Sequence, residues 1–184
     1  MKSIRVREIM VSLDDYATVH GEDNFHAAVL ALEEARRRFE TDQYKNRTVL
    51  VYGKDGRIVG KLEHLDLIRA LEPEYEKIEA LKVESRNGFT PELIDSILKE
   101  HSLWQRPLDD LCRKAAQIKV REIMQPPSKG EYIEQDAFLD EAVHKLVMGH
   151  HQSLLVTKEG SIVGILRLSD VFIKVSEGVK ACRL

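Results

Sequence analysis

Four charged residues occupy equivalent places in two similar stretches of this sequence: Glu63 and Asp66 in the first, Arg167 and Asp170 in the second. A phosphate group beside Glu63 would meet a like charge, whereas Arg167 offers five N–H donors and a permanent positive charge. At about 4 Å and an effective dielectric constant near 20, such a pair of charges is worth up to about 4 kcal/mol. We therefore expect any anionic ligand to bind on the side of Arg167 and Asp170.

The same four residues also have a purely structural interpretation. Asp66 and Asp170 both precede stretches with helical spacing, so each could cap a helix or lie in its first turn. Glu63 and Arg167 could form a salt bridge between the two stretches and close the space between them. The residues alone leave both interpretations open.

Histidines and a glycine-containing stretch raise other possibilities for chemistry. His150 and His151 are adjacent, and neighbouring side chains of a regular helix point about 100° apart, so this pair cannot chelate one metal ion from a helix. Residues 56–62 have three residues between their glycines and no Ser or Thr after the lysine, so they do not fit a phosphate-binding loop. No nucleophile or metal site accompanies the acidic residues beside His64. We expect neither a metal site nor a catalytic site.

An internal repeat organises the chain. Ile4–Met10 recurs as Ile118–Met124, 114 residues later, and Lys54–Asp66 recurs as Lys158–Asp170, 104 residues later. The first copy therefore holds about ten extra residues, which fall around 35–46. Matching blocks in the same order are stronger evidence than either short block alone.

Each copy predicts the same order of elements, β-α-β-β-α. An extended piece leads into an amphipathic helix, then two apolar runs joined by a turn, then a second helix. In the first copy these pieces are Thr18–His20, a helix through Ala28 to Phe39, Val49–Tyr52, Ile58–Val59 and Leu65–Leu71; in the second they are Glu131–Ile133, a helix through Ala142 to Val147, Leu154–Thr157, Ile162–Val163 and Val171–Val175. Asp23 or Asn24, and Asp136, are predicted N-caps. Gly56 and Gly160 are predicted to supply the positive φ of the two turns.

The segment between the copies breaks this pattern. Helices are predicted to begin near Thr90, which is followed by Pro and Glu, and at Pro107. The predicted division is a first unit at 1–72, a helical insert at 73–117 and a second unit at 118–184. Trp104 in the insert either anchors a partner protein or covers the core.

The doubled order of these blocks resembles tandem CBS domains, named after cystathionine β-synthase and also called a Bateman module. The resemblance covers about residues 4–71 and 118–176. It implies an α+β fold in which two β-α-β-β-α units pack with pseudo-two-fold symmetry, and a homodimer. It also implies a regulatory, non-catalytic role in which clefts between the units bind adenosine-containing ligands.

This sequence departs from the family motif, which is Gly-apolar-apolar-Thr/Ser-x-x-Asp. In the family the aspartate accepts hydrogen bonds from ribose hydroxyls, and the Thr or Ser donates to a phosphate. Both aspartates are present here, but Glu63 and Arg167 replace the Thr or Ser. Thr48 and Ser153 either line the same clefts or are ordinary strand starts. AMP, ADP, ATP and S-adenosylmethionine are the expected ligands, and no cofactor is required.

Bulk properties exclude several other classes. The 184 residues include 28 basic and 31 acidic side chains, giving a net charge of −3, which predicts no general attraction to nucleic acid. No apolar run approaches the ~20 residues that cross a bilayer. We expect a cytoplasmic protein without a nucleic-acid or membrane partner that signals to a protein effector in trans. The alternative function is a structural interaction module with degenerate ligand clefts.

Overall fold

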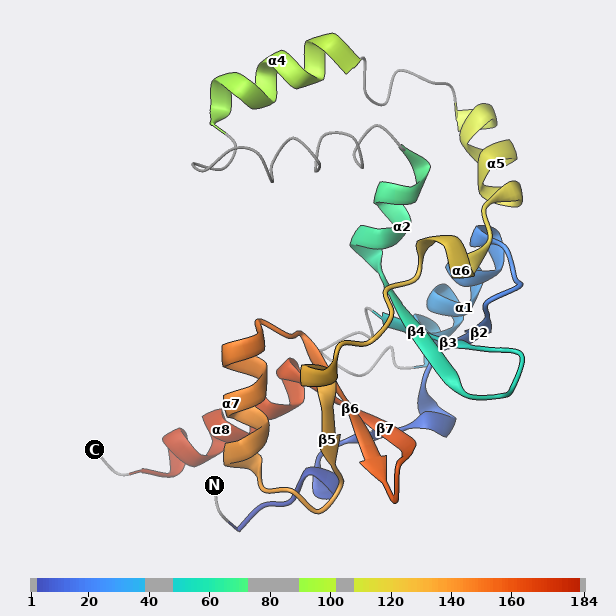
Figure 1. Ribbon diagram of the computed structural model, residues 1–184. Helices are drawn as coiled ribbons and strands as arrows, with labels where there is room; N and C mark the ends of the chain where they lie inside the picture. Colours follow the sequence, from blue (N-terminus) through green and yellow to red (C-terminus); the bar gives the residue numbers. More distant parts are fainter. Residues whose placement is uncertain (1–2, 39–47, 73–89, 102–107, 183–184) are drawn as a thin grey trace.

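The computed structural model describes residues 3–38, 48–72, 90–101 and 108–182, which form two small mixed sheets with their helices (Figure 1). The three-stranded sheet has the order β2-β3-β4 and the four-stranded sheet the order β1-β7-β6-β5. Their strands are β1 (Val11–Ser12), β2 (Thr18–His20), β3 (Thr48–Tyr52), β4 (Ile58–Glu63), β5 (Tyr132–Glu134), β6 (Ser153–Lys158) and β7 (Ser161–Arg167). In each sheet one neighbouring pair, β2–β3 or β5–β6, is parallel, and the hairpin is antiparallel.

Helices follow the predicted order in both units. The α-helices are α1 (Phe25–Arg38), α2 (His64–Leu71), α4 (Pro91–His101), α5 (Leu108–Gln117), α6 (Val120–Ile123), α7 (Leu139–Gly149) and α8 (Leu168–Ala181). Short 3-10 helices are η1 (Val6–Glu8), η2 (Leu13–Asp15) and η3 (Lys129–Glu131). The prediction of an α+β fold with two β-α-β-β-α units is confirmed.

Local sequence explains the central hairpin of each unit. The central strands β3 and β6 are buried along nearly their whole length, as their continuous apolar runs predict. Gly56 has a φ of 74° and Gly160 a φ of 79°, as predicted for the two turns. Gly164 in β7 meets another requirement, because a Cβ there would lie 2.5 Å from the carbonyl oxygen of Val11 in β1.

The two units exchange their leading segments. Val6, near the start of the first unit, is fully buried in the core of the second unit, and Val120, near the start of the second unit, is fully buried in the core of the first. The contacts match in both directions, since the Leu139 amide donates to the Ile4 carbonyl as the Phe25 amide donates to the Ile118 carbonyl. Equivalent contacts under exchange of the units are what a two-fold relation requires. Each core therefore includes residues from the leading segment of the other unit. The domain boundaries at 72/73 and 117/118 remain a prediction.

Paired ionic contacts hold the exchanged segments. Arg121 binds the Glu22 carboxylate in one direction and Arg7 binds the Asp136 carboxylate in the other. The prediction that Asp136 caps a helix is wrong, because α7 begins at Leu139 with no side-chain cap. Asp136 is the counterpart of Glu22, 114 residues later, so its carboxylate pairs with an arginine.

The N-cap prediction for the first helix is confirmed at one of its two candidates. Asn24 Oδ1 accepts a hydrogen bond of 3.0 Å from the amide of Ala27 in the first turn of α1. Asp23 Oδ2 instead accepts from the amide of His20 at 2.8 Å, which tightens the turn after β2. Asn24 therefore begins the helix while Asp23 shapes the turn that leads to it.

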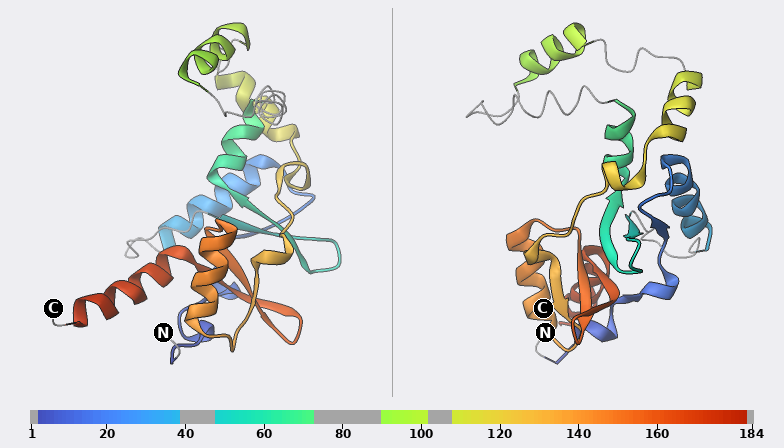
Figure 2. Two further views of the ribbon diagram at one scale, coloured as in Figure 1. Left: turned by 60° about the vertical axis from the view of Figure 1, so that its left-hand side comes forward. Right: turned by 45° about the vertical axis from the view of Figure 1, so that its right-hand side comes forward.

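Two helices of the predicted insert are described. The helix α4 begins at Pro91 after Thr90, as predicted, and it lies away from both sheets (Figures 1 and 2). The helix α5 packs against α1 and α2, and the ammonium of Lys114 donates to the Leu71 carbonyl at the end of α2 at 2.6 Å. Trp104 lies outside the described residues. None of the described helices is long and apolar enough to cross a membrane.

Candidate functional site between the two units

Apolar side chains from both sheets meet at the junction of the units. Tyr16, Leu50, Leu155 and Ile165 form one buried cluster that joins β3 of the first unit to β6 and β7 of the second. The right-hand view of Figure 2 shows the two sheets side by side at this junction. Four predicted site residues lie at the ends of the hairpin strands of the two sheets, and the other two lie in the first turns of the helices that follow. The four are Thr48, Glu63, Ser153 and Arg167, and the two are Asp66 and Asp170.

The first polar group at the junction is the tyrosine cluster, which consists of Tyr16, Thr48, Arg167 and Asp170. Tyr16 follows η2, is 7% exposed and shares a hydrogen bond with the Thr48 side chain. Burial raises the pKa of Tyr16 to about 12, although the Thr48 hydrogen bond and the nearby charge of Arg167 oppose this rise. The phenol therefore stays protonated at neutral pH and can donate a hydrogen bond there.

A bidentate ion pair completes the tyrosine cluster. Arg167 is the N-cap residue of α8, and its Nε and one terminal nitrogen each donate to Asp170 across 2.6 Å. Both side chains are 13% exposed, so the pair is shielded from water. This confirms that Asp170 lies in the first turn of a helix. It also shows that Arg167 already has an anionic partner within its own unit.

The second polar group is the lysine cluster, which consists of Lys61, Glu63, Asp66, Gln125 and Glu131. Asp66 lies in the first turn of α2, where its Oδ2 accepts from the Glu63 amide at 2.8 Å. Its other carboxylate oxygen accepts from the Gln125 side chain at 3.3 Å. The structural interpretation of Asp66 as a first-turn residue is therefore confirmed.

An ion pair between the units forms the centre of the lysine cluster. Lys61 Nζ in β4 lies 2.8 Å from Glu131 Oε2, and their side chains are 11% and 12% exposed. Glu63 lies 4.0 Å from the same ammonium, and His151 Nδ1 lies 3.7 Å from Glu131 Oε1. Burial raises the pKa of Glu131, but the hydrogen bond and charge of Lys61 outweigh it, so the pKa lies below its usual value.

Comparison with known proteins finds one family model that matches part of the sequence and several structures with a similar fold. Residues 120–177 match the family model for the CBS domain. A CBS domain of a membrane protein from Sphaerobacter thermophilus has a similar structure, with a TM-score of 0.62, 16% identity, and coverage of 94% of this chain and 88% of the other. Residues 120–177 therefore match a CBS domain, and the chain as a whole has the fold of CBS-pair structures.

Two other CBS-pair structures have the same fold over nearly the full length. CBSX2 from Arabidopsis thaliana has a TM-score of 0.59 at 16% identity, covering 97% of this chain and 98% of its own. CBSX2 in complex with AMP has a TM-score of 0.57 at 18% identity, covering 96% and 98%. No curated protein matches this sequence.

The CBS-pair fold brings most of the predicted site residues together. Thr48 and Ser153, both buried, pair in register with Glu63 and Arg167, so each polar strand start lies beside the end of the neighbouring strand. The side chain of Arg167 is held by Asp170, and a direct Glu63–Arg167 salt bridge stays a prediction. Ligand binding by any of the six predicted site residues also remains a prediction.

Sequence reasoning missed four members of these clusters: Tyr16, Lys61, Gln125 and Glu131. Tyr16 carries no local signal, because its role depends on a contact with Thr48 that is distant in the chain. Lys61 could have been noticed as a charged residue within an apolar run, where the second unit has Ile165. Glu131 likewise stands 114 residues after Ala17. A charged residue at a position where the other copy of the repeat has an apolar residue is the signal that would have identified Lys61 and Glu131.

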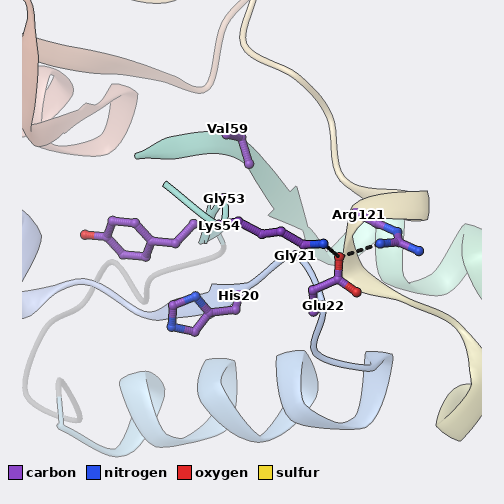
Figure 3. A pocket seen from close by; sticks show the side chains of 8 residues that line it. His20, Gly21, Glu22, Gly53, Lys54, Val59 and Arg121 are labelled. Atoms are coloured by element: carbon purple, nitrogen blue, oxygen red, sulfur yellow. Dashed lines mark hydrogen bonds and ion pairs between the residues drawn. The ribbon is translucent and has the colours of Figure 1, made fainter. Parts of the chain in front are cut away.

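A small pocket of about 160 Å³ lies away from both clusters, at the far end of the first sheet (Figure 3). His20, Tyr52 and Val59 line it, beside Lys54 and Arg121. The Glu22 carboxylate pairs with both of these cations. One carboxylate therefore neutralises part of the charge of the two cations. Within the described residues no group of histidines, cysteines and carboxylates could hold a metal ion.

Proposed function

We propose that this CBS pair is a non-catalytic regulatory protein that binds an adenosine-containing ligand with an anionic group at the tyrosine cluster. The candidate ligands are AMP, ADP, ATP and S-adenosylmethionine. The observation that carries the proposal is Arg167, a nearly buried cation beside two hydroxyl groups on an apolar floor. The complex of the similar protein CBSX2 with AMP supports the ligand class.

Ligand binding would have to open the pair between Arg167 and Asp170. A phosphate can replace the carboxylate as the bidentate partner of the guanidinium. Asp170 is then released to accept hydrogen bonds from ribose hydroxyls, the role that the family resemblance assigns to it. Because both residues lie at the start of α8, the exchange changes the contacts of this helix. A protein effector in trans would sense that change.

A homodimer is part of the same proposal. Ile68 in α2 and Phe172 in α8 hold equivalent repeat positions, and they are 51% and 60% exposed. Matching apolar side chains on the outer helices of both units would suit a symmetric contact with a second copy.

The second candidate function is a structural interaction module. It is favoured by the ion pairs that already satisfy both clusters, Arg167–Asp170 at 2.6 Å and Lys61–Glu131 at 2.8 Å. In that case no ligand opens either pair, and the helices of the insert are the surface to test for partners.

Thermal unfolding with and without each ligand separates the two candidates. AMP, ADP, ATP, S-adenosylmethionine and NAD are added to the unmodified protein, to Arg167→Ala and to Glu63→Ala. A ligand at 100 times its dissociation constant adds about 2.7 kcal/mol, which raises the Tm of a chain of this size by roughly 5–11 °C. The ligand-induced rise should disappear in Arg167→Ala and persist in Glu63→Ala.

Each variant is compared with itself, so a lower starting Tm does not affect the result. A rise that persists in Arg167→Ala and disappears in Glu63→Ala would move the ligand to the other cluster. No rise with any of the five compounds would favour the interaction module.

A further inference from the structure

The two polar clusters differ most at two equivalent positions. Lys61 in β4 stands where the second unit has Ile165 in β7, and Glu131 stands 114 residues after Ala17. Ile165 and Ala17 are both buried apolar residues, 1% and 7% exposed. Apolar contact at one side of the junction is therefore replaced by a nearly buried ion pair at the other.

This ion pair connects the two units directly. Lys61 belongs to the first sheet and Glu131 to the 3-10 helix before β5 of the second. By contrast, Arg167 and Asp170 lie three residues apart on one helix. The Arg167–Asp170 pair can open without changing how the units meet, whereas separating Lys61 from Glu131 removes a contact between them.

We propose that the Lys61–Glu131 ion pair joins the two units and prevents a ligand from binding at the lysine cluster. This CBS pair would then have one adenosine-ligand site per chain. The number of ligand sites rests on the proposed function. The role of the ion pair in joining the two units, called the joint below, does not.

The charges of the lysine cluster oppose a nucleotide. Two carboxylates, from Glu63 and Glu131, lie within 4.0 Å of the Lys61 ammonium, and the Asp66 carboxylate accepts from the Glu63 amide beside them, so a phosphate would meet a net negative charge. An adenine ring packed on Lys61 would also have to separate the ion pair and leave a nearly buried charge without its partner. In the tyrosine cluster a phosphate can replace Asp170 beside Arg167, and the positions equivalent to Lys61 and Glu131 hold the apolar residues Ile165 and Ala17.

A double-mutant cycle tests the joint without any ligand. The variants are Lys61→Ile, Glu131→Ala and the double variant, which introduce the residue types of Ile165 and Ala17 at the equivalent positions. Each single variant removes the nearest partner of a nearly buried charge and leaves a longer contact, to Glu63 at 4.0 Å or to His151 at 3.7 Å, so it should lower the Tm by roughly 6 °C or more. The double variant should lie within about 3 °C of the unmodified protein, because an apolar pair can replace a buried ion pair at little cost. A double variant that loses as much as the two single variants together would overturn the joint.

A milder cycle keeps the test decisive if a single variant does not fold. Lys61→Met and Glu131→Gln preserve the length of each side chain, and the same recovery in their double variant is expected. Additive losses in this cycle would again contradict the proposal.

Calorimetric titration with AMP tests the ligand count on the full chain. One site per chain is expected for the unmodified protein and for Glu131→Gln. Two sites per chain in the unmodified protein would overturn the proposal that the ion pair prevents binding at the lysine cluster. No binding at all would contradict the proposed function instead, and the double-mutant cycle would still decide the joint.

Discussion

The tyrosine and lysine clusters occupy equivalent places in a duplicated fold, yet they satisfy their charges in opposite ways. In the tyrosine cluster, Arg167 and Asp170 pair within one helix, beside a floor of apolar residues. In the lysine cluster, Lys61 pairs with Glu131 across the junction of the units. A few side chains therefore distinguish the tyrosine cluster, whose ion pair a ligand can open, from the lysine cluster, whose ion pair keeps a ligand out.

The rest of the repeat has changed much less. The exchanged segments are held by the same contacts in both directions, since the side chains of Arg5 and Lys119 donate to the carbonyls of Asp136 and Glu22. The carboxylates of these two acidic residues bind Arg7 and Arg121. Divergence is therefore concentrated on the side of the junction where the family motif lies.

The largest difference between the clusters should appear when their equivalent aspartates are removed. Asp170→Ala leaves Arg167 nearly buried without its bidentate partner, and we expect the free energy of unfolding to fall by about 3 kcal/mol. Asp66→Ala removes hydrogen bonds to the Glu63 amide and to Gln125, and we expect a loss of about 1 kcal/mol. Urea unfolding at neutral pH measures both. Equal losses would mean that the two aspartates have the same structural role.

A high-pH experiment isolates the tyrosine cluster. The pKa of Tyr16 is raised to about 12 from an ordinary value of 10, so the unfolded chain loses this proton first as the pH rises. The free energy of unfolding should therefore fall by about 2–3 kcal/mol between pH 10 and pH 12. Tyr16→Phe should lack this fall.

The matched control for Tyr16→Phe is Tyr52→Phe, in strand β3 of the first unit. At neutral pH the loss of the Thr48 hydrogen bond should cost Tyr16→Phe about 1 kcal/mol. Ultraviolet titration should show one tyrosine of the unmodified protein that ionises near pH 12 and is missing in Tyr16→Phe. A pH dependence unchanged by Tyr16→Phe but altered by Tyr52→Phe would reject this assignment.

The smallest effect is expected where the two units agree. Arg7→Ala and Arg121→Ala each remove an ion pair whose members are about half exposed, so each should lower the Tm by no more than roughly 2 °C. The two losses should be equal within error and should shrink at high salt. Unequal losses would show that the divergence between the units extends beyond the clusters.

Much of the fold could be predicted because its signals are local. The turns need glycine at positive φ, the central strands are continuous apolar runs, and the helices show their period within a few residues. The cap predicted at Asp136 is wrong because the structural counterpart of Asp136 is Glu22, which binds an arginine, and not the capping residue Asn24. A small shift along a repeat changes which partner a side chain meets.

The sequence by itself determined the repeated β-α-β-β-α order, the paired motif with Glu63 and Arg167, and the side of the junction that carries a positive charge. Only the tertiary structure decided that the leading segments are exchanged, that Arg167 is held by Asp170, and that Lys61 meets Glu131. The physical reason is distance along the chain. Backbone preference and periodicity act over a few residues, whereas a buried charge chooses its partner from whatever the packing of two sheets brings within about 4 Å.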